Sequence, residues 1–240
     1  MKSSGGFTLV EIAIVLVIVG LLVGGVLMPL STQVEQKRIA ETEKYLEQIK
    51  EALLGFAAAN GRLPCPATAA SNGMESPPGG GVCTNSYNGF LPAVTLGLSP
   101  VDSAGFATDA WNVVQNRIRY AVTTSNSSAF TTTGLIKSTG LGTLSSDLYV
   151  CASATGITAT TCGTATSLAT NAVAVIYSLG KNAPAGGTGL DEAANLNYDK
   201  VFVSHTEATT AAANGEFDDI VTWLSPNILF NRMVTAGQLP

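Results

Sequence analysis

Residues 12–30 contain no charged side chain, and this run constrains the fold more than any other feature of the sequence. It consists almost entirely of Ile, Val, Leu, Ala, Met and Gly. A helix needs about 20 such residues to cross the hydrocarbon core of a bilayer. The sequence therefore predicts one membrane-spanning helix over residues 7–30.

One carboxylate, Glu11, lies at the N-terminal edge of this run. A charge on a membrane helix costs about 2.5–3.5 kcal/mol at the bilayer centre and less toward the edge. We therefore expect Glu11 to have a partner. The alternative is a carboxylate that reaches the membrane interface and pairs with nothing.

The short segment 1–6 differs from a secretory signal peptide. The cleavage site of such a peptide follows the apolar stretch, whereas the small pair Gly5 and Gly6 precedes it here. Lys2 favours a cytoplasmic location for the short side and export of the remainder. The expected location is the cytoplasmic membrane, with one pass and the bulk of the chain outside the cytoplasm.

A second, amphipathic segment is expected to continue the helix over residues 31–60. It is rich in Glu, Lys, Gln, Ala and Leu, which favour helices. The apolar stripe has a spacing of three or four residues, with Thr42 in one gap. Its members are Ile39, Thr42, Leu46, Ile49, Leu53 and Phe56. The pair Asn60–Gly61, followed by prolines, predicts the C-terminal end.

Glycine and proline interrupt the apolar half of this helix. Gly24 and Gly25 weaken a turn, and Pro29 cannot donate a hydrogen bond to the carbonyl of residue 25. We expect a kink or an unwinding segment between Gly20 and Pro29; the alternative is a membrane helix that tolerates both residue types. The spacing Gly20-x-x-x-Gly24 also favours close helix packing.

Residues 61–240 are expected to form a globular head. The first part, to about residue 107, is rich in proline and glycine and predicts loops, and strand patterns follow it. The predicted strands cover 117–123, 147–153, 172–179, 200–205 and 219–224. Ser225, Pro226 and Gly237 predict a short closing helix. The fold class is α+β, with a long N-terminal helix packed on an antiparallel sheet.

Four cysteines indicate an oxidising compartment. None forms a CxxC pair, and the chain has a single histidine, so a zinc site is poorly supported. Four cysteines allow three disulfide connectivities, of which we favour the local one. It pairs Cys65 with Cys83 and Cys151 with Cys162. The alternative is four buried free thiols.

Composition argues against nucleic-acid binding and against catalysis. The net charge is −5 and only 12% of residues are charged, whereas phosphate binding needs clustered Lys and Arg. His205 has no neighbouring catalytic motif, and no G-x-S-x-G, H-E-x-x-H or phosphate-binding loop occurs. The sequence therefore predicts a protein that is not an enzyme.

The stretch GGFTLVE, residues 5–11, resembles the class III signal of type IV prepilins and pseudopilins. The resemblance implies that prepilin peptidase cleaves after Gly6, N-methylates Phe7 and leaves the apolar helix in place. It also implies that Glu11 pairs with the N-terminus of a neighbouring subunit. The implied partners are the peptidase, other pilin or pseudopilin subunits, an inner-membrane assembly platform and, before assembly, the membrane.

Within this family the chain most resembles a minor pilin. Cleavage after Gly6 would leave 234 residues (240 − 6), more than many major subunits have. The alternatives are a type II secretion pseudopilin, a membrane-tethered adhesion or binding module and, from a third class, an anchored periplasmic enzyme. The final location would be a periplasmic or extracellular filament.

The segments SLGKN (178–182) and EFDDIVTW (216–223) resemble the calcium-binding region of major pseudopilins, with an insertion between them. The resemblance implies calcium held by loop oxygens, with Asp218, Asp219 and Glu216 as candidates, and Asp191 and Asp199 as further ones. Carboxylate oxygens are the ligands that calcium prefers. The alternative is that these acids are simply solvated.

Overall fold

The computed structural model describes residues 6, 8–187 and 189–240, without the side chains of 22–30 and 185. The chain divides into two compact units, Met1–Ala40 and Glu41–Pro240. The second unit therefore begins inside the segment 31–60, ahead of the head expected at 61. The reason is that the apolar stripe of the helix becomes buried from Thr42 onward.

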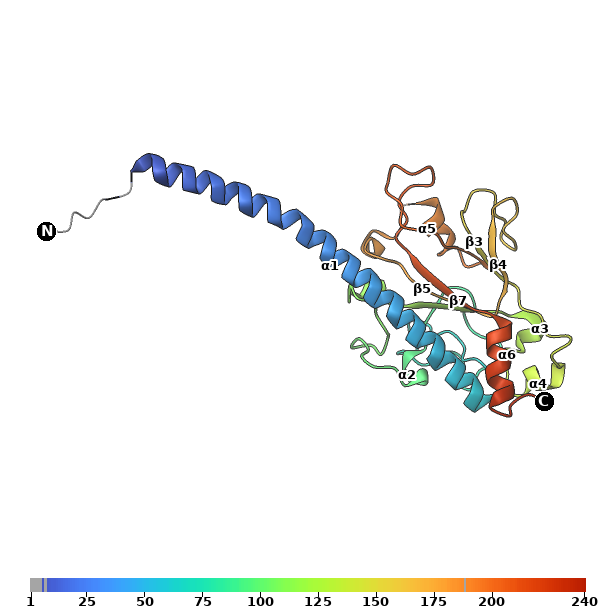
Figure 1. Ribbon diagram of the computed structural model, residues 1–240. Coiled ribbons are helices and arrows are strands. Elements are labelled where there is room, and N and C mark those ends of the chain that lie inside the picture. The colour runs from blue at the N-terminus through green and yellow to red at the C-terminus, as the bar shows by residue number, and fades with distance from the viewer. Residues whose placement is uncertain (1–5, 7, 188) are drawn as a thin grey trace. The chain divides into compact units, whose positions relative to one another are not determined.

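The first helix, α1, runs from Leu9 to Asn60 (Figure 1). It ends where the sequence predicts, and Gly61 follows with a positive φ of 70°. Residues 20–29 are helical throughout, so a segment that unwinds there stays a prediction. Among residues described with their side chains, no helix combines the length and the apolar character needed to cross a membrane. The predicted span 7–30 includes residue 7 and the side chains of 22–30, which lie outside that description.

The second unit has three layers: the C-terminal part of α1, a four-stranded sheet and a three-stranded sheet. The first sheet is antiparallel, in the order β1-β2-β5-β7. Its strands are β1 (Gly89–Phe90), β2 (Arg119–Val122), β5 (Ala174–Ser178) and β7 (Ile220–Leu224). The predicted antiparallel sheet is thus present, with β5 buried along its whole length.

The second sheet was not predicted as a separate layer. It has the order β4-β3-β6, from β3 (Leu148–Cys151), β4 (Ser167–Ala172) and β6 (Val201–Val203). Strands β3 and β4 are antiparallel, whereas β3 and β6 are parallel. Parallel neighbours need a long connection, and the chain between β3 and β6 forms β4 and β5 before it returns.

The two faces of the first sheet pack into two different cores, because successive side chains of a strand point to opposite faces. On β5, Ile176 packs with Leu46, Ile49 and Leu53 of α1. The neighbouring Tyr177 points to the opposite face and packs among residues of the second sheet, including Phe202. The amphipathic stripe therefore covers one face, as the sequence predicts.

Short helices connect these layers. They are α2 (Ala93–Leu96), α3 (Ser125–Ser128), α4 (Leu135–Thr139) and α5 (Leu190–Ala194), with 3-10 turns at Val114–Asn116 and Ala183–Ala185. The closing helix α6 spans Pro226–Thr235, and the Ser225 hydroxyl caps it by accepting from the Ile228 amide. Leu229 and Met233 of α6 are buried in the core with α1.

Two disulfides close loops of the head. The expected local disulfides, Cys65–Cys83 and Cys151–Cys162, are both formed.

Candidate functional site

The N-terminus of α1 is closed by Thr8 and Glu11. The Glu11 Oε2 atom accepts hydrogen bonds from the Thr8 amide at 2.7 Å and from the Thr8 hydroxyl at 2.8 Å. In return, the Glu11 amide donates to Thr8 Oγ1 at 3.3 Å. This is a capping box, in which two residues three apart satisfy each other's free amide groups. Glu11 therefore has a local role in starting the helix.

The first turns of α1 expose an apolar surface on all sides. Leu9 is 87% exposed, and the other large apolar side chains as far as Leu21 are also exposed. A Cβ added at Gly20 would meet no atom within 4 Å. Exposed apolar surface of this extent marks contact with lipid or with other proteins. Gly5 and Phe7 lie outside the described residues, and only the backbone is described at Gly24 and Pro29.

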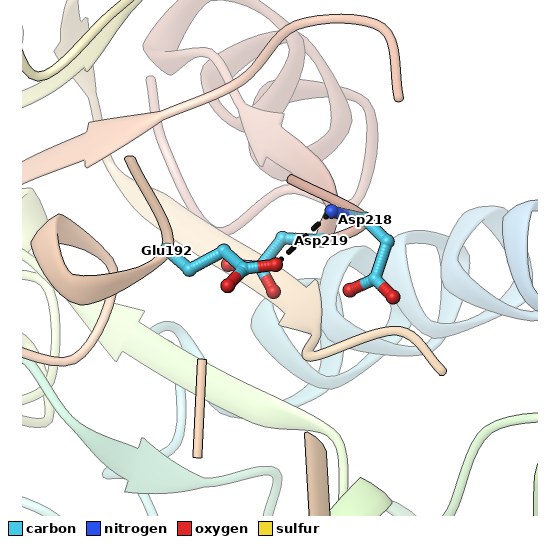
Figure 2. Close-up of side chains that lie close together, drawn as sticks. All are labelled: Glu192, Asp218 and Asp219. Atoms are coloured by element: carbon cyan, nitrogen blue, oxygen red, sulfur yellow. Dashed lines mark hydrogen bonds between the residues drawn. The ribbon is translucent and has the colours of Figure 1, made fainter. Parts of the chain in front are cut away.

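A second candidate site is a group of three buried acids next to β7. Glu192, Asp218 and Asp219 each place one carboxylate oxygen within 4.8 Å of the others (Figure 2). Asp218 and Asp219 immediately precede β7, and Glu192 belongs to α5. Carboxylates this close repel one another, so a divalent cation held by oxygen ligands would suit this position.

Neighbouring donors hold each of these acids in place. The Asn182 amide donates to Asp218 Oδ2 at 3.0 Å, and Asn195 Nδ2 donates to Asp219 Oδ2 at 2.7 Å. Asn182 Nδ2 donates to Glu192 Oε1 at 2.7 Å. These side chains are therefore oriented before any cation binds.

Burial disfavours ionisation of the two aspartates. It raises the pKa of Asp218 to about 7; the hydrogen bond from Asn182 opposes this rise, and the nearby Glu192 charge adds to it. Burial also raises the pKa of Asp219 well above its ordinary value. A cation at this position would stabilise the ionised forms.

Other predicted metal ligands lie elsewhere. Glu216 lies outside the group of three acids, and its carboxylate is 3.9 Å from the ammonium of Lys181. Asp199 Oδ1 accepts from the Val201 amide at 2.8 Å at the start of β6. Asp191 faces His205. Of the five candidate acids, the structure brings together Asp218 and Asp219, and it adds Glu192.

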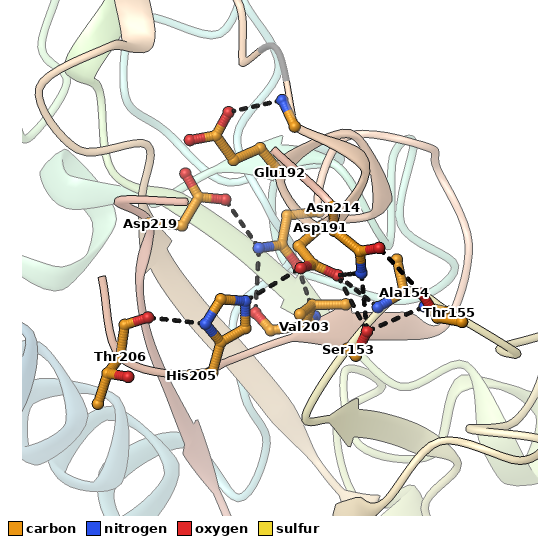
Figure 3. A network of polar contacts seen from close by, with 12 residues as sticks. Ser153, Ala154, Thr155, Asp191, Glu192, Val203, His205, Thr206, Asn214 and Asp219 are labelled. Carbon is orange, nitrogen blue, oxygen red and sulfur yellow. Dashed lines mark hydrogen bonds and ion pairs between the residues drawn. The ribbon is translucent and has the colours of Figure 1, made fainter. Parts of the chain in front are cut away.

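His205 takes part in a polar network centred on Asp191 (Figure 3). His205 Nε2 lies 3.1 Å from Asp191 Oδ2, and Asn214 Nδ2 donates to Asp191 Oδ1 at 2.9 Å. The Ser153 hydroxyl also points to Asp191 Oδ1, at 3.5 Å. Because serine and histidine both bind the carboxylate, the imidazole is not placed to activate the hydroxyl as a nucleophile.

The N-terminal segment of the chain matches a known family model. Residues 1–27 match the family model described as the prokaryotic N-terminal methylation motif. The chain carries the class III signal of type IV pilins and pseudopilins. This motif ends within the apolar half of α1, and the α+β architecture beyond it is consistent with a pilin-like fold.

Comparisons of the whole chain with curated proteins and with solved structures gave no match. The relation of this chain to type IV pilins and pseudopilins therefore rests on the class III signal.

Sequence reasoning missed Glu192, which the fold brings to the aspartates. Glu192 lies within the insertion between the two pseudopilin-like segments, next to Asp191, which the sequence analysis considered as a further candidate. Its one local signal is Gly189, whose amide donates to Glu192 Oε2 at 3.2 Å. Glycine is one of the residues accepted at an N-cap, so this position is compatible with the start of α5 but says nothing about the neighbours of the helix.

Proposed function

We propose that this chain is a structural subunit of a type IV pilus or pseudopilus. Prepilin peptidase cleaves it after Gly6 and methylates Phe7, and the apolar helix is then packed among copies of similar helices. Before assembly the chain is held in the cytoplasmic membrane by residues 7–30. The methylation motif at residues 1–27, continuous with α1, is the observation that carries this proposal.

The chemistry of the cleaved terminus explains the need for Glu11. Cleavage creates an α-ammonium group at Phe7, four residues before Glu11. In low dielectric each charge alone is costly, and a close pair is much less so. Pairing Glu11 with the ammonium of a neighbouring subunit would therefore favour helices in a staggered bundle. The exposed apolar surface near Gly20 supports packing against such helices.

Within this class we propose a minor pilin. The mature length of 234 residues (240 − 6) and two disulfides in internal loops support this choice over a major pilin. A minor subunit should be rare in sheared filaments, and its deletion should change the number of filaments. A type II secretion pseudopilin would instead be required for protein export.

Intact mass spectrometry of the native protein tests the proposal. We expect loss of residues 1–6 and one methyl group on the new terminus. Deleting the peptidase should restore residues 1–6 and remove the protein from sheared filament fractions.

Intact mass, together with one activity measurement, separates the other classes of function. A tethered adhesion or binding module would keep its full mass and stay in the membrane fraction whether or not the peptidase is present. An anchored enzyme would lose an activity when His205 is replaced by alanine. Either result would contradict the assignment to a filament.

We also propose that the head binds calcium through Asp218 and Asp219. Two observations support the fit. Asp218 Oδ1 is buried and accepts no hydrogen bond from the described residues, and a Cβ added at Gly180 would come within 2.3 Å of that oxygen. Calcium would supply positive charge to neighbouring carboxylates and so stabilise the loop before β7.

Calcium titration into the full chain in detergent tests this second proposal. A rise in the melting temperature with calcium chloride, reversed by a chelator and absent from Asp218→Asn, is expected. An unchanged melting temperature of the wild type would remove the calcium proposal and leave the filament proposal intact.

A further inference from the structure

Helix α5 carries two adjacent buried acids that face different parts of the head. Asp191 is 5% exposed and Glu192 is fully buried. Figure 3 shows the Glu192 carboxylate apart from the groups that contact Asp191. The Gly189 amide at the start of α5 donates to Glu192 Oε2 at 3.2 Å. The other oxygens of the two carboxylates need partners from other segments, because a buried carboxylate is costly without hydrogen bonds.

Glu192 joins α5 to the segment before β7. Its Oε1 accepts from Asn182 Nδ2 at 2.7 Å and from the Asp218 amide at 3.3 Å. The second of these contacts is the dashed line in Figure 2. Glu192 therefore lies against both segments that surround Asp218, although it comes from the insertion between them.

The polar groups around this carboxylate are incompletely satisfied. Within the described part of the chain, Asp218 Oδ1 and Asn182 Oδ1 are buried oxygens without a hydrogen-bond partner. Lys181, next to Asn182, directs its ammonium to Glu207 at 2.6 Å. Buried acceptors without donors are costly, and a cation satisfies several at once.

Asp191 joins the same helix to the second sheet. Its Oδ1 accepts from the Ala154 amide, just beyond β3, and from Asn214 Nδ2. Its Oδ2 meets His205, which follows β6 and stacks on the Phe217 ring with centroids 3.9 Å apart. Asn195, immediately after α5, also accepts from the Val203 amide of β6 at 2.7 Å.

We propose that Glu192 is a third calcium ligand, supplied by α5, and that bound calcium thereby fixes the second sheet to the first. This inference rests on the calcium site proposed at Asp218 and Asp219 and adds its regulation. With calcium, Glu192 holds α5 against the segment before β7. Asp191 and Asn195 then transmit this restraint to the ends of β3 and β6.

Hydrogen exchange of the full chain in detergent, with calcium chloride or with a chelator, tests the proposal directly. Calcium should slow amide exchange in residues 216–219, in 189–195 around α5, and in 152–156 after β3. Magnesium chloride at the same concentration serves as the comparison, because magnesium requires a stricter octahedral geometry. Slower exchange confined to 216–219 would overturn the proposal while leaving the calcium site.

Two variants test separately whether Glu192 binds calcium and whether Asp191 connects α5 to the second sheet. Glu192→Gln should weaken calcium affinity, measured by calorimetry, by at least about tenfold. Asp191→Asn should keep wild-type affinity but lose the calcium-dependent protection of 152–156. Glu43→Gln removes an exposed acid of α1 that is not one of the three acids, and it should change neither result.

The possible results separate the role of Glu192 from the calcium site itself. Wild-type affinity in Glu192→Gln would exclude this residue as a ligand, and the aspartate site would stand. Absence of calcium binding by the wild type would remove both. If Glu192→Gln does not fold, the exchange of 189–195 in the wild type decides, because a ligand on α5 must protect α5.

Discussion

Glu11 has one role in the structure and a second in the proposed filament. In the single chain its carboxylate accepts from the Thr8 amide and hydroxyl and so starts α1. In the proposed filament the same carboxylate pairs with the ammonium of a neighbour. Glutamine can serve in a capping box, but it cannot neutralise an ammonium. This difference allows the two roles to be tested separately.

Replacing Glu11 with glutamine should therefore block assembly and preserve the helix start. We expect Glu11→Gln and Glu11→Ala both to lower the amount of this subunit in sheared filaments by at least about tenfold, the effect of losing about 1.4 kcal/mol. Cleavage and methylation should continue in both. If Glu11→Gln enters filaments at the wild-type level, charge pairing is not required and the cap is the function of this residue.

Asp109 is a buried acid that the proposed functions do not use. Its Oδ2 accepts from the Ser178 hydroxyl and from Asn116 Nδ2, and its Oδ1 accepts from the Trp111 amide. Burial raises its pKa above the ordinary value despite these bonds. The folded state therefore holds this proton to a higher pH than the unfolded state does.

The stability of the head should consequently fall as pH rises past the unfolded pKa of Asp109, near 3.9. Above that pH the unfolded chain has released the proton and the folded chain has not, until the pH also exceeds the folded pKa. In Asp109→Asn the free energy of unfolding should fall less over this pH range, because the variant has no carboxyl group at this position. Urea unfolding of wild type and variant from pH 4 to 7, in the presence of a chelator, measures the difference. An equal slope in both proteins would contradict the prediction.

At the scale of elements, an ion pair fixes the loop that follows α1. The Arg62 guanidinium and the Glu75 carboxylate form two hydrogen bonds of 2.8 Å, and both side chains are buried. Glu75 also accepts from the amides of Cys65 and Gly79. The loop thus depends on one carboxylate as well as on its disulfide.

Breaking this pair on one side should cost more than removing both partners. Arg62→Met leaves a buried carboxylate and should lower the free energy of unfolding by about 3–5 kcal/mol. The double variant Arg62→Met, Glu75→Gln should recover part of that loss. Urea unfolding of the four proteins of this cycle gives the coupling. Additive losses would show that the two side chains act independently.

Several elements could be predicted because their signals are local. The end of α1 at Asn60 follows from Gly61, and α6 follows from Ser225 and Pro226. The alternation of Ile118, Tyr120 and Val122 places β2 correctly, with these side chains in the core shared with α1. In each case one short segment contains the capping residue, the turn residue or the alternation of apolar side chains that defines the element.

Other elements depend on contacts distant in sequence. Strand β4 is mostly exposed and has the sequence SLATNA, which shows no apolar alternation. It pairs with β3. The sequence predicts β3 and β6 as strands, but not that they are parallel neighbours, because some fifty residues separate them. The same holds for the acid site. Asp218 and Asp219 are adjacent and were predicted, whereas Glu192 reaches them only through the fold of the insertion.

At the scale of the whole molecule, α1 belongs to two units with opposite surface requirements. Up to Leu21 its described apolar side chains are exposed, which suits lipid or neighbouring helices. From Thr42 to Leu53 its apolar stripe is buried in the head, where the Thr42 hydroxyl also accepts from the Ala110 amide at 3.2 Å. The head should therefore need the second part of the helix for its own stability, and the first part for assembly.

Two truncations test this division. A fragment of residues 31–240 keeps every buried residue of the stripe and should fold as a soluble monomer. A fragment of residues 50–240 lacks Leu46 and Ile49, and removing two large buried side chains should cost about 4 kcal/mol or more. That is a large part of the stability of an ordinary domain, so its melting temperature, read by circular dichroism, should fall steeply or its transition should disappear. If both fragments melt alike, the head does not depend on the stripe. If the longer fragment aggregates while the full chain in detergent stays folded, the head needs residues before 31 and the division near residue 40 is wrong.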